Sequence, residues 1–173
     1  MSPQILVVRP AGEGDEGLLS SFTCSTGPPH EAEVEAFVRK DLLAWVLAPG
    51  AEVDDPRALL LLDETTSESL VAVAAHERLT ELLVRGKPLD GTKAHVVAVA
   101  LASRRTRIAG RRPGDLAFEA LRHDARTRQR RRGPALAAVV AEANKPSLAL
   151  CDRHGLTATV PRSPGYLWRV GRL

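Results

Sequence analysis

The first fifty residues combine one short apolar run with helical spacings of apolar side chains. Residues 4–10, QILVVRP, form an apolar run that ends at a proline, which predicts a strand. Residues 13–22 begin with acidic side chains, which suit the first turn of a short helix. Residues 30–50 predict the longest helix of this half, ended by a Pro-Gly pair. Its helical spacing joins Val34, Phe37, Val38, Leu42, Trp45 and Val46.

The middle of the chain is mainly strand-like. Residues 57–79 predict two β segments joined by a polar turn at residues 63–69. Residues 91–103 form a Val-rich run, which predicts a further strand. Residues 114–129 then return to helical spacing. We therefore expect a β-hairpin, a strand, an Arg-rich loop and a helix in succession.

The last forty residues continue the alternation. Residues 133–142 predict a strand, residues 144–155 a short helix, and residues 156–160 and 165–173 a final hairpin. Alternating strands and helices require at least one parallel crossover, so the fold class is α+β (mixed α/β). The chain has no internal repeat and no convincing linker, and we expect one domain over residues 1–173.

Composition excludes several classes of function. Hydrophobic residues make up 44% of the chain and charged residues 26%, which are ordinary globular values. Aromatic residues make up only 3%, so the core must be aliphatic and a base-stacking platform for single strands is disfavoured. Cys24 and Cys151 lie far apart and the five histidines show no ligand spacing, so no metal site is expected. Neither a signal peptide nor a membrane span is present, which predicts a soluble cytoplasmic protein.

The positive charge is unevenly placed. The formal net charge is +3, and arginines concentrate in residues 104–114 and 122–133. The planar guanidinium of arginine donates two hydrogen bonds at once to anions such as phosphate, so a phosphate-containing partner is expected. The second cluster fits a solvated helix face equally well. The first cluster is expected in a loop, where that explanation is weaker.

Residues 144–156, NKPSLALCDRHGL, carry the spacing Asn-x-x-Ser-x-x-Leu-Cys-x-x-x-Gly-Leu. This spacing resembles the second motif of the GNAT superfamily of acyl-CoA-dependent N-acetyltransferases, Asn-x-x-Ala-x-x-Leu-Tyr-x-x-x-Gly-Phe. The order of elements along nearly the whole chain is also similar to that family. The resemblance implies a central mixed sheet of six to seven strands flanked by about four helices. It also implies acetyl-CoA as cosubstrate and a primary amine, not identified by the sequence, as acceptor.

The family's first motif is a strand, a phosphate-binding turn Arg/Gln-x-x-Gly-x-Gly/Ala and a helix, and residues 109–121 resemble it in two registers. One register places Gly114 at the last position, with Ala109 and Arg112 replacing the first two; the other begins at Arg111 and ends at Leu116. Helix N-termini bind pyrophosphate through free N–H groups. A glycine helix entry with solvent-facing arginines is the structural alternative. The resemblance implies these cofactor-binding residues: Val97, Val99, Leu101, Gly110, Arg111, Arg112, Gly114, Asp115, Asn144 and Ser147.

The implied reaction is direct attack of an amine on the thioester, which needs a base and is assisted by an acid. The family's usual acid is a tyrosine, where this chain has Cys151. Cys151 can serve as the acid, although a small residue packed in a helix is the more ordinary role. The candidate bases are His76, Glu77 and His95, each of which could instead be a strand-end surface residue. A water-mediated proton path is equally open.

Residues 22–25, FTCS, followed by the amphipathic stretch of residues 31–45, resemble the toxin-type branch that acetylates aminoacyl-tRNA. Together with the arginine clusters, this leaves RNA open as an acceptor. The family often forms dimers through its C-terminal strands, so a homodimer is also implied. Two competing classes remain: a degenerate GNAT-fold module that binds CoA, RNA or a protein without turnover, and a plain α/β interaction module.

Overall fold

The computed structural model describes residues 5–66 and 69–173. Gln4, the start of the first expected strand, and residues 67–68 of the expected turn lie outside the described residues. The strands are β1 (Leu6–Pro10), β2 (Arg57–Asp63), β3 (Ser69–Leu79), β4 (Leu83–Val84), β5 (Lys87–Pro88), β6 (Gly91–Val99), β7 (Ala135–Ala141), β8 (Ala158–Ser163) and β9 (Tyr166–Arg172). The α-helices are α1 (Glu16–Ser20), α2 (Pro29–Ala36), α3 (Leu42–Leu47), α4 (Pro113–Thr127), α5 (Gln129–Arg132) and α6 (Lys145–Arg153).

One mixed sheet organises the molecule. Within the described residues it has seven strands in the order β1-β2-β3-β6-β7-β9-β8, which confirms the expected α+β class with a sheet of six to seven strands. Every neighbouring pair is antiparallel except β6 and β7, which run parallel. The short hairpin of β4 and β5 forms a separate two-stranded sheet and was not predicted.

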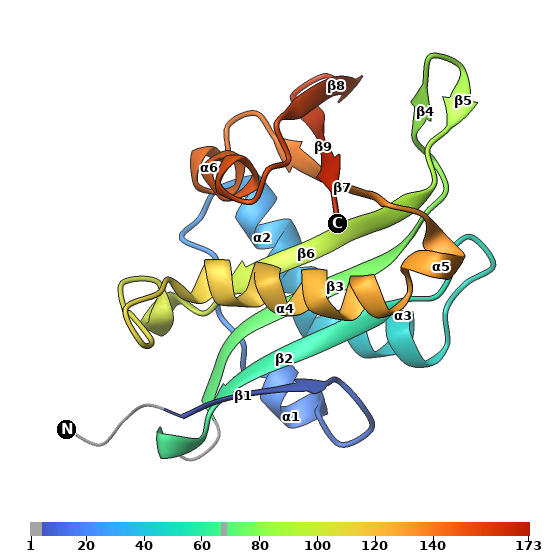
Figure 1. Cartoon of the computed structure of the whole chain (residues 1–173). Helices are drawn as coiled ribbons and strands as arrows, with labels where there is room; N and C mark the ends of the chain where they lie inside the picture. The colour runs from blue at the N-terminus through green and yellow to red at the C-terminus, as the bar shows by residue number, and fades with distance from the viewer. Residues whose placement is uncertain (1–4, 67–68) are drawn as a thin grey trace.

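Helices cover both faces of the β1–β6 half of the sheet. Figure 1 shows α4 crossing one face while α1, α2 and α3 lie on the other. The side chains of β2 divide accordingly, because Leu59 and Leu61 pack in the α4 core while Leu60 and Leu62 pack in the opposite core. A strand buried on both faces needs apolar residues at every position. The uninterrupted leucine run of β2 therefore follows from its central place.

Two predicted elements differ in detail. The helix expected over residues 30–50 is continuous from α2 to α3 but contains a π-helical segment, η1 (Phe37–Asp41). The strand expected over residues 91–103 ends at Val99 and is followed by a 3₁₀ turn, η3 (Leu101–Ser103). Leu101, expected to offer strand backbone to the cofactor, thus lies beyond the strand. No helix in the described part of the chain combines the length and apolar character that crossing a bilayer requires.

The parallel pair β6 and β7 is short. Gly91 to Ala94 pair with Ala135 to Ala138, and beyond these residues the two strands separate. The pairing begins at Gly91, where the two backbones lie very close together. A Cβ built on Gly91 would lie 2.4 Å from the carbonyl oxygen of Ala135. The first residue of β6 can therefore approach β7 only as glycine.

We predict that Gly91→Ala lowers the free energy of unfolding by about 1–3 kcal/mol, because the added methyl overpacks the contact with Ala135. Urea denaturation followed by circular dichroism measures the change. Gly50→Ala is the matched control, since no atom lies within 4 Å of a Cβ built there. Equal stability of the two variants would contradict the close approach.

Candidate functional site

A groove opens where β6 and β7 separate. Val97 and Val99 of β6 line one side, and Asn144 and Ser147 at the start of α6 line the other. Gly114, in the first turn of α4, lines it as well. Its cavity volume is ≈ 330 Å³. The groove therefore brings together the β6 edge and the N-termini of two helices, a combination suited to an elongated ligand that carries an anion.

The start of α6 is held by its own side chain. The Asn144 Oδ1 accepts a hydrogen bond from the Ser147 N–H at 3.1 Å, which makes Asn144 the N-cap of the helix. Pro146 occupies the first turn, where a proline costs no backbone hydrogen bond. The Asn-x-x-Ser spacing thus has a local structural cause, and it also fixes the helix start at the groove.

The loop before α4 is anchored by Ile108. Ile108 and Arg111 exchange two backbone hydrogen bonds of 3.0 Å each, and Ala109 and Gly110 between them have φ values of 50° and 78°. Both positive values are those of a type I′ turn. The Ile108 side chain is buried in the α4 core. Gly110 therefore serves the turn and lines a shallow depression next to the groove rather than the groove itself.

The predicted cofactor residues at the start of α4 have distinct surroundings. Arg112 is the N-cap of α4, is exposed, and lines both the groove and the depression, whereas Arg111 forms an exposed ion pair with Glu119. A Cβ on Gly114 would meet Val99 at 3.6 Å, an ordinary contact, so space alone does not require glycine there.

The Asp115 side chain is bonded to residues at the end of α6. Its Oδ1 lies 2.8 Å from Arg153 Nη2 and 3.2 Å from His154 Nε2. Burial by itself raises the pKa of Asp115, but the bonds to Arg153 and His154 outweigh it and hold the pKa below its usual value. Asp115 therefore ties the start of α4 to the end of α6, so that the two helices are fixed relative to each other.

Solved structures resemble this arrangement, although the sequence matches no protein-family model and no curated protein. An acetyltransferase from Thermus thermophilus is 19% identical, with a TM-score of 0.66 over 100% of both chains. A GNAT-family protein from Desulfovibrio desulfuricans is 16% identical, with a TM-score of 0.59 over 98% of both chains. A tyrosine-to-phenylalanine mutant of the AtaT toxin, bound to acetyl-CoA and the C-terminus of the antitoxin AtaR, is 12% identical, with a TM-score of 0.65 over 94% of this chain and 91% of that one.

The chain has the GNAT fold. The fold places the groove between the parting strands, and of the ten predicted cofactor residues it gathers Val97, Val99, Arg112, Gly114, Asn144 and Ser147 around it. Leu101 lies outside the groove, and Gly110, Arg111 and Asp115 line the adjacent depression.

A second cavity of this GNAT fold continues the groove and contains Cys151. Cys151 lies on α6 and is 3% exposed, and its burial raises the pKa of the thiol to about 11. The thiol therefore keeps its proton at neutral pH. Tyr166 of β9 lines the same cavity, and its hydroxyl lies 3.5 Å from Glu33 Oε2. Tyr166 is not among the residues predicted from the sequence, where its one distinguishing feature is that it is the single tyrosine.

Glu77 and His95 also come together beside this cavity. His95 lines the cavity, and its Nδ1 lies 3.2 Å from the buried Glu77 carboxylate. Lys93 Nζ approaches the same Glu77 oxygen at 3.2 Å. Burial by itself raises the pKa of Glu77, but the His95 hydrogen bond and the Lys93 charge outweigh it and lower the pKa below its usual value. Two of the three candidate bases thus form one pair.

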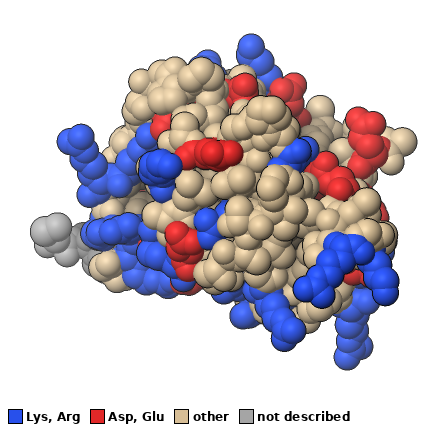
Figure 2. Space-filling view, turned by 90° about the horizontal axis from the view of Figure 1, so that it is seen from above, with Lys and Arg blue, Asp and Glu red and all other residues tan. Residues whose placement is uncertain are grey.

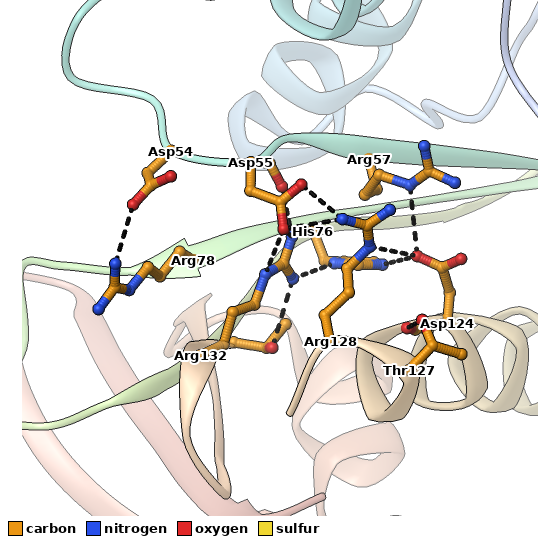
Figure 3. A network of polar contacts seen from close by, with 10 residues as sticks. Asp54, Asp55, Arg57, His76, Arg78, Asp124, Thr127, Arg128 and Arg132 are labelled. Atoms are coloured by element: carbon orange, nitrogen blue, oxygen red, sulfur yellow. Dashed lines mark hydrogen bonds and ion pairs between the residues drawn. The ribbon is translucent and has the colours of Figure 1, made fainter. Parts of the chain in front are cut away.

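His76, the third candidate base, lies elsewhere, in a buried polar network on the α4 face (Figure 3). Its Nε2–H donates to Asp124 at 2.9 Å, and its Nδ1 accepts from Arg132 at 2.7 Å, so both ring nitrogens are used. Burial is the main cause that lowers the pKa of His76, which makes the ring neutral at pH 7. His76 is fully buried and lines neither the groove nor the cavity. A catalytic role for His76 gains no support from this position.

The second arginine cluster supplies part of this network. Arg132 is 1% exposed and lies 2.9 Å from the Asp55 carboxylate, and Arg128 lies 2.7 Å from it (Figure 3). These side chains join α4 and α5 to the segment before β2. Of the two explanations left open for the cluster, a solvated helix face fits only its exposed members, such as Arg130 and Arg131.

We predict that Asp124→Asn removes a pH-dependent contribution to stability. The hydrogen bond from His76 is the main cause that lowers the pKa of Asp124 to about 2, against the opposing effect of burial. A lowered folded-state pKa stabilises the protein above the unfolded value, and this contribution is lost as pH falls from about 4 to 2. Near neutral pH, the free energy of unfolding of the wild type should exceed that of the variant by on the order of 2 kcal/mol. The difference should shrink through that acid window.

Urea denaturation at a series of pH values measures this difference, with Glu13→Gln, at an exposed loop residue, as the control. The measurements should run from pH 5 to pH 2, which begins about one unit above the expected window. If the difference in unfolding free energy between wild type and Asp124→Asn stays constant over this range, the lowered pKa of Asp124 is not its cause.

Proposed function

We propose that the chain binds acetyl-CoA in the groove and transfers the acetyl group to a primary amine. The observation that carries this proposal is the separation of β6 from β7 opposite the N-termini of α4 and α6. Solved structures with the same fold include one with acetyl-CoA bound, which supports the choice of ligand. The pyrophosphate would meet the free N–H groups of the helix starts and the guanidinium of Arg112.

The reaction then proceeds by direct attack. The amine nitrogen forms a bond to the thioester carbon, the carbonyl oxygen takes the negative charge, and the tetrahedral intermediate expels the CoA thiolate. Backbone N–H groups along residues 95–99 of β6, which have no β7 partner among the described residues, could donate to that oxygen. A base removes one ammonium proton before attack, the nitrogen loses a second proton as the intermediate collapses, and an acid or water protonates the thiolate. The hydrogen-bonded pair of Glu77 and His95 is the candidate source of the base, and Cys151 is the candidate acid.

The acceptor is a primary amine, and RNA-borne amines stay open within this proposal. Figure 2 shows Lys and Arg side chains at several places on one face, with Asp and Glu between them. Positive charge on that face is therefore interspersed rather than gathered into one continuous surface. Arg128 and Arg132 are engaged internally and would not contact phosphate. A small amine or a peptide lysine is thus compatible with the same site.

The second candidate is a GNAT-fold module that binds CoA, RNA or a protein without turnover. Two observations favour it: Cys151 stands where the family motif has tyrosine, and Gly110 belongs to a turn of its own outside the groove. Binding of acetyl-CoA without release of CoA thiol would select this candidate.

We predict that the protein binds acetyl-CoA and that Arg112→Ala weakens the binding about 10- to 100-fold, because one charge-assisted hydrogen bond to phosphate contributes about 1.5–3 kcal/mol. Isothermal titration calorimetry with acetyl-CoA measures the affinity, and adenosine 3′,5′-bisphosphate tests the nucleotide part alone. Arg130→Ala, at an exposed arginine of α5, is the matched control. Arg111→Ala should have a smaller effect than Arg112→Ala, because Arg111 is paired with Glu119.

Turnover distinguishes the two candidate functions. CoA thiol release is followed with acetyl-CoA and, in turn, spermidine, a lysine-containing peptide and total aminoacyl-tRNA. Amine-dependent release supports the transferase. Unchanged affinity in Arg112→Ala would contradict the placement of the phosphate, and absence of acetyl-CoA binding by folded protein would contradict the proposed function itself.

A further inference from the structure

His95 owes its position to an irregularity in β6. The pairing of β3 with β6 runs Ala75 to Val96 and then His76 to Ala94, so His95 is an extra residue on β6 without an opposite partner. Such a β-bulge re-aims the side chain at that position. Here it lets His95 line the cavity while its ring reaches Glu77 on the neighbouring strand.

The contact with Glu77 fixes which ring nitrogen carries the proton. The Glu77 carboxylate can only accept, so Nδ1 of His95 donates the hydrogen bond of 3.2 Å. In the neutral ring, Nε2 is then the basic nitrogen. No other described residue hydrogen-bonds this ring. His76 differs, because Asp124 and Arg132 occupy its two nitrogens.

Two aromatic side chains hold the His95 ring. Its centroid lies 4.8 Å from that of Phe37 and 4.9 Å from that of Trp45, with the Trp45 plane tilted by 29°. In a regular α-helix, residues eight apart point about 80° away from each other. The π-helical turn η1 inserts roughly one residue between Phe37 and Trp45, which brings them to about 20° of each other. The bulge in β6 and the π-helical turn η1 therefore both help to position the His95 ring.

We propose that His95 is the general base of the transfer reaction, with Glu77, Phe37 and Trp45 as positioning residues. This inference rests on the proposed function. The Nε2 lone pair takes one proton from the acceptor ammonium, the freed amine attacks the thioester, and the imidazolium is stabilised by the Glu77 carboxylate. That proton then leaves to water. The nitrogen loses a second proton as the tetrahedral intermediate collapses, and this proton ends on the departing CoA thiolate, so the products are the amide and CoA thiol and the enzyme returns to its starting state.

The test uses the amine that gives the highest wild-type rate of CoA thiol release. His95→Gln should lower kcat about 10²- to 10⁴-fold, the usual contribution of a general base, with acetyl-CoA affinity unchanged by calorimetry. Glu77→Gln should lower kcat less, because the ring remains. His123→Gln, at an exposed histidine of α4, is the matched control and should leave kcat unchanged.

Two further readouts distinguish a base from a packing residue. The acid limb of the kcat/KM pH profile should disappear in His95→Gln, and added imidazole should restore part of the rate of His95→Ala but not of Glu77→Ala. A His95→Gln enzyme with the wild-type rate and pH profile would overturn the assignment while leaving the transferase intact. A wild type that binds acetyl-CoA but acetylates none of the amines overturns the proposed function, and the base with it.

Discussion

The short parallel pairing of β6 with β7 is the constraint on which the rest of the site depends. Backbone N–H and C=O groups need partners, and in most sheets a neighbouring strand supplies them along the whole length. Here the parallel register ends at Ala94, while β6 continues to pair with β3 and β7 with β9. The opening between the strands therefore presents backbone groups of β6 and β7 that have no strand partner on this side within the described residues. Backbone groups of this kind are available to form hydrogen bonds with a ligand.

Hydrogen bonds and ion pairs fix the position of α4 near both of its ends. At its start, Asp115 bonds to Arg153 and His154 at the end of α6. At the other end, Arg132 in α5 reaches Asp55 and His76 in the interior. Burying a charge is costly unless it is paired, and Arg132 is paired on several sides. The charged residues of this network therefore fix the positions of α4 and α5, and the burial of Arg132 is explained without a phosphate ligand.

Much of the fold could be predicted from the sequence because its elements carry strong periodic signals. The leucine run of β2, the Asn144 cap of α6 and the apolar spacing of α4 each specify a local structure by short-range rules. Element order and motif spacing then sufficed to indicate the GNAT fold. The groove was predicted in part, since six of the ten expected cofactor residues line it, on β6 and at the starts of α4 and α6.

Which of the two candidate histidines, His76 or His95, lines the cavity could not be predicted, for a physical reason. Strand side chains alternate with a period of two, and one inserted residue reverses every later assignment. The bulge at His95 is such an insertion, and the π-turn at η1 is its helical counterpart. Both depend on long-range packing, which no local window reveals. The sequence therefore identified the candidate residue types but not which of them would share a cavity.

The state of Cys151 also bears on the chemistry. A cysteine beside a thioester raises the alternative of an acetylated enzyme intermediate, but the nucleophile in such a step is the thiolate. Because burial raises its pKa to about 11, the Cys151 thiol keeps its proton at pH 7. It is also 3% exposed, so the sulfur has little access to a substrate carbonyl. Burial thus works against a covalent intermediate on Cys151.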